Sequence, residues 1–415
     1  MKPTLPYAAV LSPLLVIPPM TAAAAAPPVF KPQVIDSSIR IGYGLALGDM
    51  DGDKKQDILL ADAREIAWYH NPDWKKHVIA RDLTKLDHVC LDAADIDGDG
   101  KVEVAVGAQW NPGETTNEKL SGAVLFLKRP EASDAKPEAG AGSETLWQSV
   151  TLPHEPTVHR LRWVKNGEGK HALVVLPLHG RGNTNGSGSN GTKILAYTPP
   201  ASSAQWEDAA AWKTAALDAC LHITHNFDLL ADGGGEAMVI GGKEGALLAK
   251  PSGPGWETSS LPLLETPAPA PFAGVGEIRF FPGTKQRLAT IEPFHGPNVC
   301  TWTWEEKQRG WRREVVDSSL SSGHALAVGD MNGDNLPDLI AGWREPDSAG
   351  KFGIRLYTAT GDTAQPWSSS WLAGENSMAC EDLKLADLDG DGRLEVIASG
   401  RATKNVVIYW NKAAE

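Results

Sequence analysis

The segments GDMDGDKKQD (residues 48–57), ADIDGDGKVE (94–103), GDMNGDNLPD (329–338) and ADLDGDGRLE (386–395) are four copies of one pattern. Counted from the first Asp of each copy, side chains that carry oxygen stand at positions 1, 3, 5 and 9, with glycine at position 4. A hard cation such as Ca²⁺ takes about six to eight oxygen ligands, often from one tightly turned loop. The pattern therefore predicts four calcium loops.

The residues beside these loops are short apolar alternations, such as LALGD before the first loop and DILLA after it. An EF-hand has helices on both sides of its loop, so these flanks predict strands instead. The alternative is an Asp-rich turn without metal, but four such acidic clusters would repel themselves unless a cation neutralised them. The predicted structural calcium ligands are Asp49, Asp51, Asp53, Asp57, Asp95, Asp97, Asp99, Glu103, Asp330, Asn332, Asp334, Asp338, Asp387, Asp389, Asp391 and Glu395.

The repeat predicts an all-β fold, a seven-bladed β-propeller. Three further stretches, residues 159–175, 225–241 and 276–292, keep the apolar alternation but lack the acidic loop, which makes seven units in total. Most units end in a strand that a tryptophan leads: residues 74–79, 147–152, 212–217, 256–261, 311–316 and 371–372. Calcium-bound turns that recur between short strands are typical of propeller blades, and the tryptophans are expected to pack between the blades.

The N-terminal part of the repeat is predicted to close the ring. Residues 30–49 match residues 311–330 without a gap, whereas the last unit stops near Trp410 without a tryptophan-led strand. Residues 34–39 are therefore expected to complete the C-terminal blade, which removes two free sheet edges. Residues 131–144 and 180–191 fall outside the repeat and are predicted to form mobile loops, because they are rich in Gly, Ser, Pro and acidic residues.

Composition and the N-terminus indicate an exported protein. The 415-residue chain has a formal net charge of −13, which argues against nucleic-acid binding, and no later apolar run predicts a membrane span. Residues 1–26 read as a cleaved signal peptide and residues 27–415 as the propeller. The alternative is a disordered or membrane-anchoring leader, but prolines interrupt its apolar stretch. Cys90, Cys220, Cys300 and Cys380 permit three pairings or free thiols.

One position of the inner strands is rich in histidine. The first strand of each blade lines the channel, so one register of it faces a common axis. Six residues before the anchor Asp, the seven units carry Tyr43, Val89, His159, His225, Gly276, His324 and Glu381. His88 stands one residue away and is expected to join them through a β-bulge. We expect this register at the channel end opposite the calcium loops.

The second strand of each blade runs back toward that same end and ends in polar and aromatic residues. These are Trp110, His179, Arg181, His295, Arg344 and Arg401. Together they predict a pocket for a carbohydrate, because an aromatic ring stacks on sugar C–H faces while Arg and His bond hydroxyls. Three imidazoles that meet on an axis can also bind zinc and leave a fourth position open. The alternative is a wet channel whose histidines bond only to water.

The loops and blades resemble FG-GAP/VCBS-type repeats, as in integrin α-subunit propellers. The histidines, with LHGRG (178–182) and FHGPN (294–298), are similar to the propeller domain of the aldos-2-ulose dehydratase family. That family dehydrates keto-sugars such as 1,5-anhydrofructose and holds zinc at the bottom of its propeller cleft. The resemblance implies zinc ligation by His159, His225 and His324. The chain lacks room for the family's cupin and lectin-like domains, so an isomerase step is not expected.

The resemblance implies α-proton abstraction from a keto-sugar, followed by β-elimination. Zinc would polarise the ketone, and Glu381, His88 or His179 would take the proton. His295 would protonate the departing oxygen, while Tyr43 and Arg344 are further candidate site residues.

Two other functions compete with this zinc-dependent lyase. The first is a non-enzymatic, calcium-stabilised propeller that binds glycans or proteins. The second is a polysaccharide lyase that abstracts a proton beside a uronate carboxylate. It ranks last because Arg181, Arg344 and Arg401 are few for such a substrate.

Overall fold

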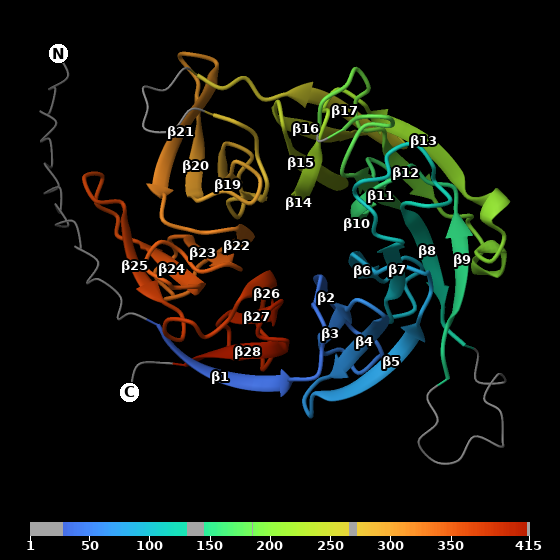
Figure 1. Cartoon of the computed structure of the whole chain (residues 1–415), viewed down its shortest axis with the longest axis horizontal. Coiled ribbons are helices and arrows are strands. Elements are labelled where there is room, and N and C mark those ends of the chain that lie inside the picture. Colours follow the sequence, from blue (N-terminus) through green and yellow to red (C-terminus); the bar gives the residue numbers. More distant parts are fainter. Residues whose placement is uncertain (1–27, 131–144, 185, 265–271, 413–415) are drawn as a thin grey trace, which may run out of the picture.

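The computed structural model describes residues 28–130, 145–184, 186–264 and 272–412. These residues form seven antiparallel sheets of four strands each, arranged in a ring about a central axis (Figure 1). The predicted seven-bladed, all-β propeller is confirmed, and the three units without an acidic loop each supply a blade. The predicted signal peptide and the loop at residues 131–144 lie outside the described residues.

The blades follow one another along the chain, and each begins with its innermost strand. Blade 1 contains β2 (Gly44–Gly48), β3 (Asp57–Ala61), β4 (Glu65–His70) and β5 (Lys75–Arg81). Blade 2 contains β6 (Cys90–Ala94), β7 (Glu103–Ala108), β8 (Ala123–Lys128) and β9 (Gln148–Leu152). Blade 3 contains β10 (Val158–Lys165), β11 (His171–Pro177), β12 (Ile194–Thr198) and β13 (Lys213–Asp218), with short 3₁₀ turns η2 (Ser203–Gln205) and η3 (Ala209–Ala211). Blade 4 contains β14 (Thr224–Asp232), β15 (Gly235–Gly242), β16 (Gly245–Ser252) and β17 (Gly255–Ser260).

The remaining blades complete the ring. Blade 5 contains β18 (Ile278–Phe280), β19 (Arg287–Glu292), β20 (Asn298–Glu305) and β21 (Gly310–Asp317). Blade 6 contains β22 (Gly323–Gly329), β23 (Asp338–Trp343), β24 (Gly353–Ala359) and β25 (Trp367–Trp371). Blade 7 contains β26 (Cys380–Ala386), β27 (Glu395–Gly400) and β28 (Asn405–Lys412), and its outer strand is β1 (Val29–Asp36).

The N-terminal strand β1 pairs with the C-terminal strand β28, with Val29 opposite Lys412. The structure thus pairs the two ends of the chain, as the gapless match to residues 311–330 predicts. The strand itself runs earlier than the predicted 34–39, because Phe30 occupies the place that Trp311 takes in β21. Phe30 packs against the apolar cluster of blades 6 and 7, and this contact sets where β1 begins.

Apolar clusters fill the space between neighbouring blades. Ile66 of β4 and Val104 of β7, for example, belong to one cluster that joins blades 1 and 2. Trp74, Trp212 and Trp311 are buried in such clusters, as predicted. In blade 6 the outer strand begins with Trp367, whereas Trp371, which the sequence predicts to lead it, ends it. All four cysteines are free thiols, and all but Cys220 are buried.

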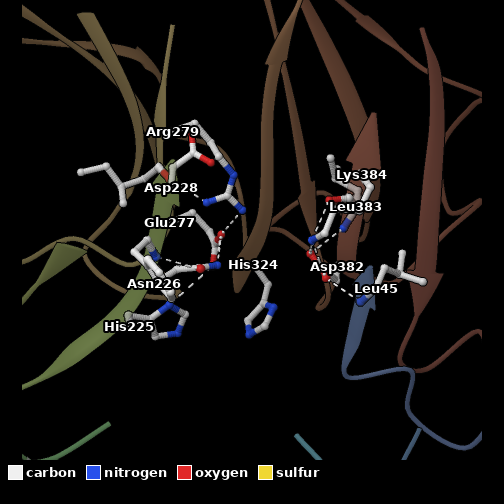
Figure 2. A network of polar contacts seen from close by, with 12 residues as sticks. Leu45, His225, Asn226, Asp228, Glu277, Arg279, His324, Asp382, Leu383 and Lys384 are labelled. Atoms are coloured by element: carbon white, nitrogen blue, oxygen red, sulfur yellow. Dashed lines mark hydrogen bonds and ion pairs between the residues drawn. The ribbon is translucent and has the colours of Figure 1, made fainter. Parts of the chain in front are cut away.

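The innermost strand of each blade has one edge that no strand pairs, and aspartates cover part of it. In three places an inner-strand Asp accepts a hydrogen bond from a backbone N–H of the next blade's inner strand. The pairs are Asp92 with Trp163 (2.7 Å), Asp228 with Phe280 (2.9 Å) and Asp382 with Leu45 (2.8 Å). Figure 2 shows the contact of Asp382 with Leu45. A buried N–H without an acceptor is costly, so these carboxylates hold neighbouring blades together.

We predict that Asp382→Ala lowers the free energy of unfolding by about 2–4 kcal/mol, because Leu45 N–H loses its acceptor and Lys384 its carboxylate. Asp232→Ala is the matched control: it breaks an ion pair with Lys285 at the surface and is expected to cost about 1 kcal/mol or less. Urea unfolding measures both changes. Equal losses would show that the aspartates of the inner strands do not join the blades.

Candidate functional site

β-bulges at the start of several inner strands aim side chains into the channel. The register of the inner strand shifts between Val158 and Arg160, Thr224 and Phe227, Gly323 and Ala325, and Cys380 and Asp382. The residues within these shifts include His159, His225, His324 and Glu381, all members of the predicted register. A bulge sets two residues against one on the partner strand and redirects their side chains. The bulges therefore explain why one register gathers at one end of the channel.

Four imidazoles meet there, and we call them the histidine cluster: His159, His225, His295 and His324. Ring centroids are 4.8 Å apart for His159 and His225, 4.7 Å for His225 and His295, and 4.6 Å for His295 and His324. His295 is exposed, whereas the other three rings are buried. The indole of Trp110 stacks on His159 at 5.1 Å. The cluster thus presents one accessible imidazole and an aromatic face.

Backbone carbonyls set the tautomers of two of these rings. Nδ1 of His159 lies 2.9 Å from the carbonyl oxygen of His225, and Nδ1 of His324 lies 2.6 Å from that of Glu381. A carbonyl only accepts, so Nδ1 carries the proton and Nε2 keeps its lone pair. Burial lowers the pKa of both rings well below the ordinary value, with help from neighbouring cationic groups. Both imidazoles are therefore neutral at pH 7.

The ring nitrogens of His225, His295 and His324 lie within 4.8 Å of one another and make up a candidate metal centre. The sequence predicts His159 in this set, but the structure brings His295 into its place. Nδ1 of His225 lies 3.5 Å from Glu277 Oε1, so a carboxylate stands beside the ring nitrogen that would not bind the metal and can orient the ring. Three imidazoles match the donor preference of zinc. The three donors therefore match the ion in type and number.

Arg344 touches the cluster in a way that opposes metal binding at His295. Its Nη2 lies 3.3 Å from Nδ1 of His295, which leaves the ring proton on Nε2, and that Nε2 is 2.7 Å from Nε2 of His225. A metal on Nε2 of His295 would move the proton to Nδ1, facing the guanidinium. Metal binding and this arginine contact therefore compete.

Glu381 is buried between two arginines. Arg344 Nη1 lies 3.3 Å from its Oε2, and Arg401 Nη1 lies 2.9 Å from its Oε1. Burial raises the pKa of Glu381, although the charges of both arginines act against that shift. The sequence predicts Glu381 as the base. Since a guanidinium occupies each oxygen, the geometry instead makes it a positioning residue for Arg344 and Arg401.

Tyr43 lies beside Arg401. Its hydroxyl donates to Asp87 Oδ2 at 3.0 Å, and the Arg401 guanidinium lies 5.4 Å from its ring centroid. Burial, followed by the charge of Asp87, raises the pKa of Tyr43 to about 12. The phenol therefore keeps its proton at neutral pH and acts as a hydrogen-bond donor.

His88 and His179 stand apart from the cluster. His88 is fully buried, and the side-chain charges that act on it come from Arg64 and Asp87. The backbone at His179 bridges to Ile223, and burial lowers the pKa of its ring. In the part of the chain that the structure describes, neither ring contacts a cluster histidine. The expected bulge therefore does not bring His88 in, and the base role for either remains without geometric support.

Sequence reasoning missed Glu277, Asn226 and Arg160, which stand beside the register and not in it. Glu277 accepts from Asn226 Nδ2 at 2.7 Å and pairs with Arg279 Nη2 at 2.8 Å (Figure 2). Burial alone would raise the pKa of Glu277. The charge of Arg279 and the contact with His225 nevertheless hold this pKa well below its ordinary value. Each missed residue directly follows a residue of the histidine-rich register. A search that also included the next residue, as a bulge requires, would have found them.

The acidic loops lie at the other end of the inner strands. In the first loop, Asp49 accepts from the backbone N–H groups of Gly52 (2.6 Å) and Lys54 (2.7 Å), and Asp57 accepts from Met50 (2.8 Å). The other three loops repeat these bonds. Positions 4 and 6 have positive φ in every copy, which explains the glycine at position 4.

Carboxylates gather in these loops at distances that suit a cation. Carboxylate oxygens lie within 4.8 Å of one another in the sets Asp49, Asp51 and Asp57; Asp95, Asp97 and Asp99; and Asp387, Asp389 and Glu395. The third loop has Asn332 at position 3 and contributes Asp330, Asp334 and Asp338. Burial raises the pKa of Asp57 and Asp338 to about 6 and that of Glu103 to about 7. The oxygen donors fit calcium.

A family model for FG-GAP-like repeats matches residues 49–106 and 330–398, which include all four acidic loops. The chain carries FG-GAP-like repeats. A chain in the crystal structure of the mitotic checkpoint complex has a TM-score of 0.54 and 13% identity, with 99% of both chains covered. BBS1N, in a mercury-soaked complex with ARL6DN, has a TM-score of 0.50 and 13% identity, covering 94% of this chain and 97% of that one.

These similarities at low identity describe the fold alone. No curated protein matches the chain. Among the described residues, no helix is long and apolar enough to cross a membrane.

We predict that Glu381→Ala destabilises the fold by about 3–5 kcal/mol, because it leaves Arg344 and Arg401 unpaired beside a buried site. Glu375→Ala, which breaks an exposed pair with Lys351, is expected to cost about 1 kcal/mol or less. Denaturant unfolding compares the two. A Glu381 variant as stable as the control would favour a catalytic over a positioning role.

Proposed function

We propose that this FG-GAP-repeat propeller is an exported, zinc-dependent carbohydrate lyase that acts on a keto-sugar at the histidine cluster. One observation carries the proposal: ring nitrogens of His225, His295 and His324, which three different blades supply, lie within 4.8 Å of one another. The exposed face of His295 and the indole of Trp110 give a sugar access to this point. Export rests on the predicted signal peptide, and the link to the aldos-2-ulose dehydratase family stays a prediction from sequence.

The roles of the chain's own groups follow from their protonation states. Zinc, when bound, would polarise the carbonyl oxygen of the sugar. His159 lies outside the metal set, is neutral, and keeps the lone pair of Nε2, so it is the candidate proton acceptor. Tyr43 keeps its proton and is a candidate hydrogen-bond donor to the departing oxygen. Arg344 and Arg401, held by Glu381, orient the sugar hydroxyls.

The alternative is a non-enzymatic propeller that binds glycans or proteins and uses calcium only for stability. The burial of three of the four imidazoles favours this alternative, because buried and hydrogen-bonded rings also serve as structural groups. In either case we propose that calcium occupies the four acidic loops. The support is the repeated oxygen donor set and the mutual repulsion of carboxylates without a cation.

We predict that His225→Ala and His324→Ala each abolish tight zinc binding, while His159→Ala retains it but loses lyase turnover. His179→Ala is the matched control, since its ring stands apart from the cluster. Metal analysis after dialysis against a mild chelator measures zinc content. Wild-type protein without retained zinc would contradict the lyase proposal and support the binding propeller. Zinc that depends on His159 would restore the ligand set predicted from sequence.

We predict that the protonation of Asp57, Asp338 and Glu103 makes the metal-free protein more stable at about pH 5 than at about pH 8. Their pKa values are raised in the folded state, so the folded protein holds protons that the unfolded chain releases. This stabilisation is present below the ordinary pKa and is lost as pH rises through the folded values of about 6 to 7. Calcium competes with these protons, so it should raise the melting temperature more at about pH 8.

Calorimetry with either chelator or millimolar calcium at both pH values tests this prediction. A melting temperature that does not respond to calcium at the higher pH would show that the loops are turns without metal.

A further inference from the structure

The channel below the histidine cluster contains a cation without a carboxylate partner. Arg160 lines a cavity of about 190 Å³, together with Tyr43, Asn226, Lys384 and others. Its Nη1 donates to the carbonyl oxygen of His159 at 3.0 Å. Across the described residues of the chain, no carboxylate lies within ion-pair distance of this guanidinium. A half-buried arginine with open donors is unusual beside so many acids in a chain of net charge −13.

The other cations of this cavity are already neutralised. Arg162 lies 3.3 Å from Asp228, and Lys384 lies 2.9 Å from Asp382. Asp92 also lines the cavity and accepts from the backbone of Trp163. Arg160 is therefore the cation of this cavity whose guanidinium no carboxylate contacts, and Glu277 and Glu381 act on its charge only from a distance.

The position of Arg160 links it to the site above. It directly follows His159 within the bulge of β10, which turns both residues toward the channel. Its charge contributes to lowering the pKa of His159, His225, His295 and His324. The bond from its Nη1 to the carbonyl oxygen of His159 places the guanidinium beside the backbone of a cluster histidine, where a ligand on the cluster can reach it.

We propose that the sugar bound at the histidine cluster carries a carboxylate, which Arg160 binds. The guanidinium offers a planar pair of N–H donors that matches a carboxylate, and a neutral sugar would leave those donors without a carboxylate in contact. The amide of Asn226, which also lines the cavity, adds a polar neighbour. This inference rests on the proposed function, because it places the acid group of the ligand at the same site.

Two six-carbon keto-sugars test the proposal: 2-ketogluconate, which has a carboxylate, and fructose, which does not. Titration calorimetry with the full chain should show that 2-ketogluconate binds at least about tenfold more tightly, with a preference that weakens as salt is added. Arg160→Gln should lower the affinity for 2-ketogluconate by about 10- to 100-fold and leave fructose binding and zinc content unchanged. Arg160→Lys, which keeps the charge but not the fork, should lose less.

Arg181→Gln is the matched control, since Arg181 is tied to Glu118 and Glu155 at the surface. Thermal unfolding checks that each variant folds, and the salt dependence of the wild-type protein tests the proposal without any variant. The carboxylate assignment alone would be overturned if the protein retained zinc but bound both sugars equally. It would also be overturned if the protein retained zinc but did not bind 2-ketogluconate. Absence of both zinc and sugar binding in the wild type would overturn the lyase proposal and this inference with it.

Discussion

The unpaired edges of the innermost strands govern the interior of this propeller. Each inner strand turns backbone N–H groups toward an axis where no further strand can pair with them. Aspartates from neighbouring blades satisfy three of these groups, at Trp163, Phe280 and Leu45. Those carboxylates in turn require cations, which Arg162 and Lys384 supply beside two of them. The polar channel is thus a consequence of closing seven sheets into a ring.

The two ends of the inner strands have separate tasks. At one end, tightly turned acidic loops accept hydrogen bonds from their own backbone and gather oxygen donors for a cation. At the other end, bulges break the regular pairing and turn consecutive residues inward. A regular strand would send alternate residues to opposite faces, so it could not bring both His159 and Arg160 to the channel. The bulged end therefore gathers the histidine cluster, and the regular end holds the acidic loops.

Electrostatics also differ between the ends. The chain is acidic overall, yet Arg344 and Arg401 pair with Glu381 near the histidine cluster, and Arg160 follows His159 there without a carboxylate in contact. Burial disfavours a charged imidazole, and the nearby arginine charges disfavour it further. The rings of His159 and His324 therefore stay neutral. Neutral imidazoles and nearby guanidinium groups make an environment suited to oxygen ligands and anions.

Counting and aligning the repeats in the sequence determined the number of blades, the position of the acidic loops and the pairing of the two chain ends. It succeeded because propeller blades are local units whose hydrophobic period and turn chemistry are written in consecutive residues. It also placed His225 and His324 in one register. It failed at Glu277 and Arg160, since a bulge shifts the inward-facing position by one residue without any signal in the apolar pattern.

Only the tertiary structure decided which imidazoles meet. His295 comes from the segment after β19 and enters the cluster in the place expected for His159, while His88 and His179 remain elsewhere. Glu381 likewise changed from an expected base to the partner of two arginines. Distances between side chains of different blades depend on how the sheets twist and pack around the axis. No local property of the chain encodes that arrangement, because it arises only when all seven blades are in place.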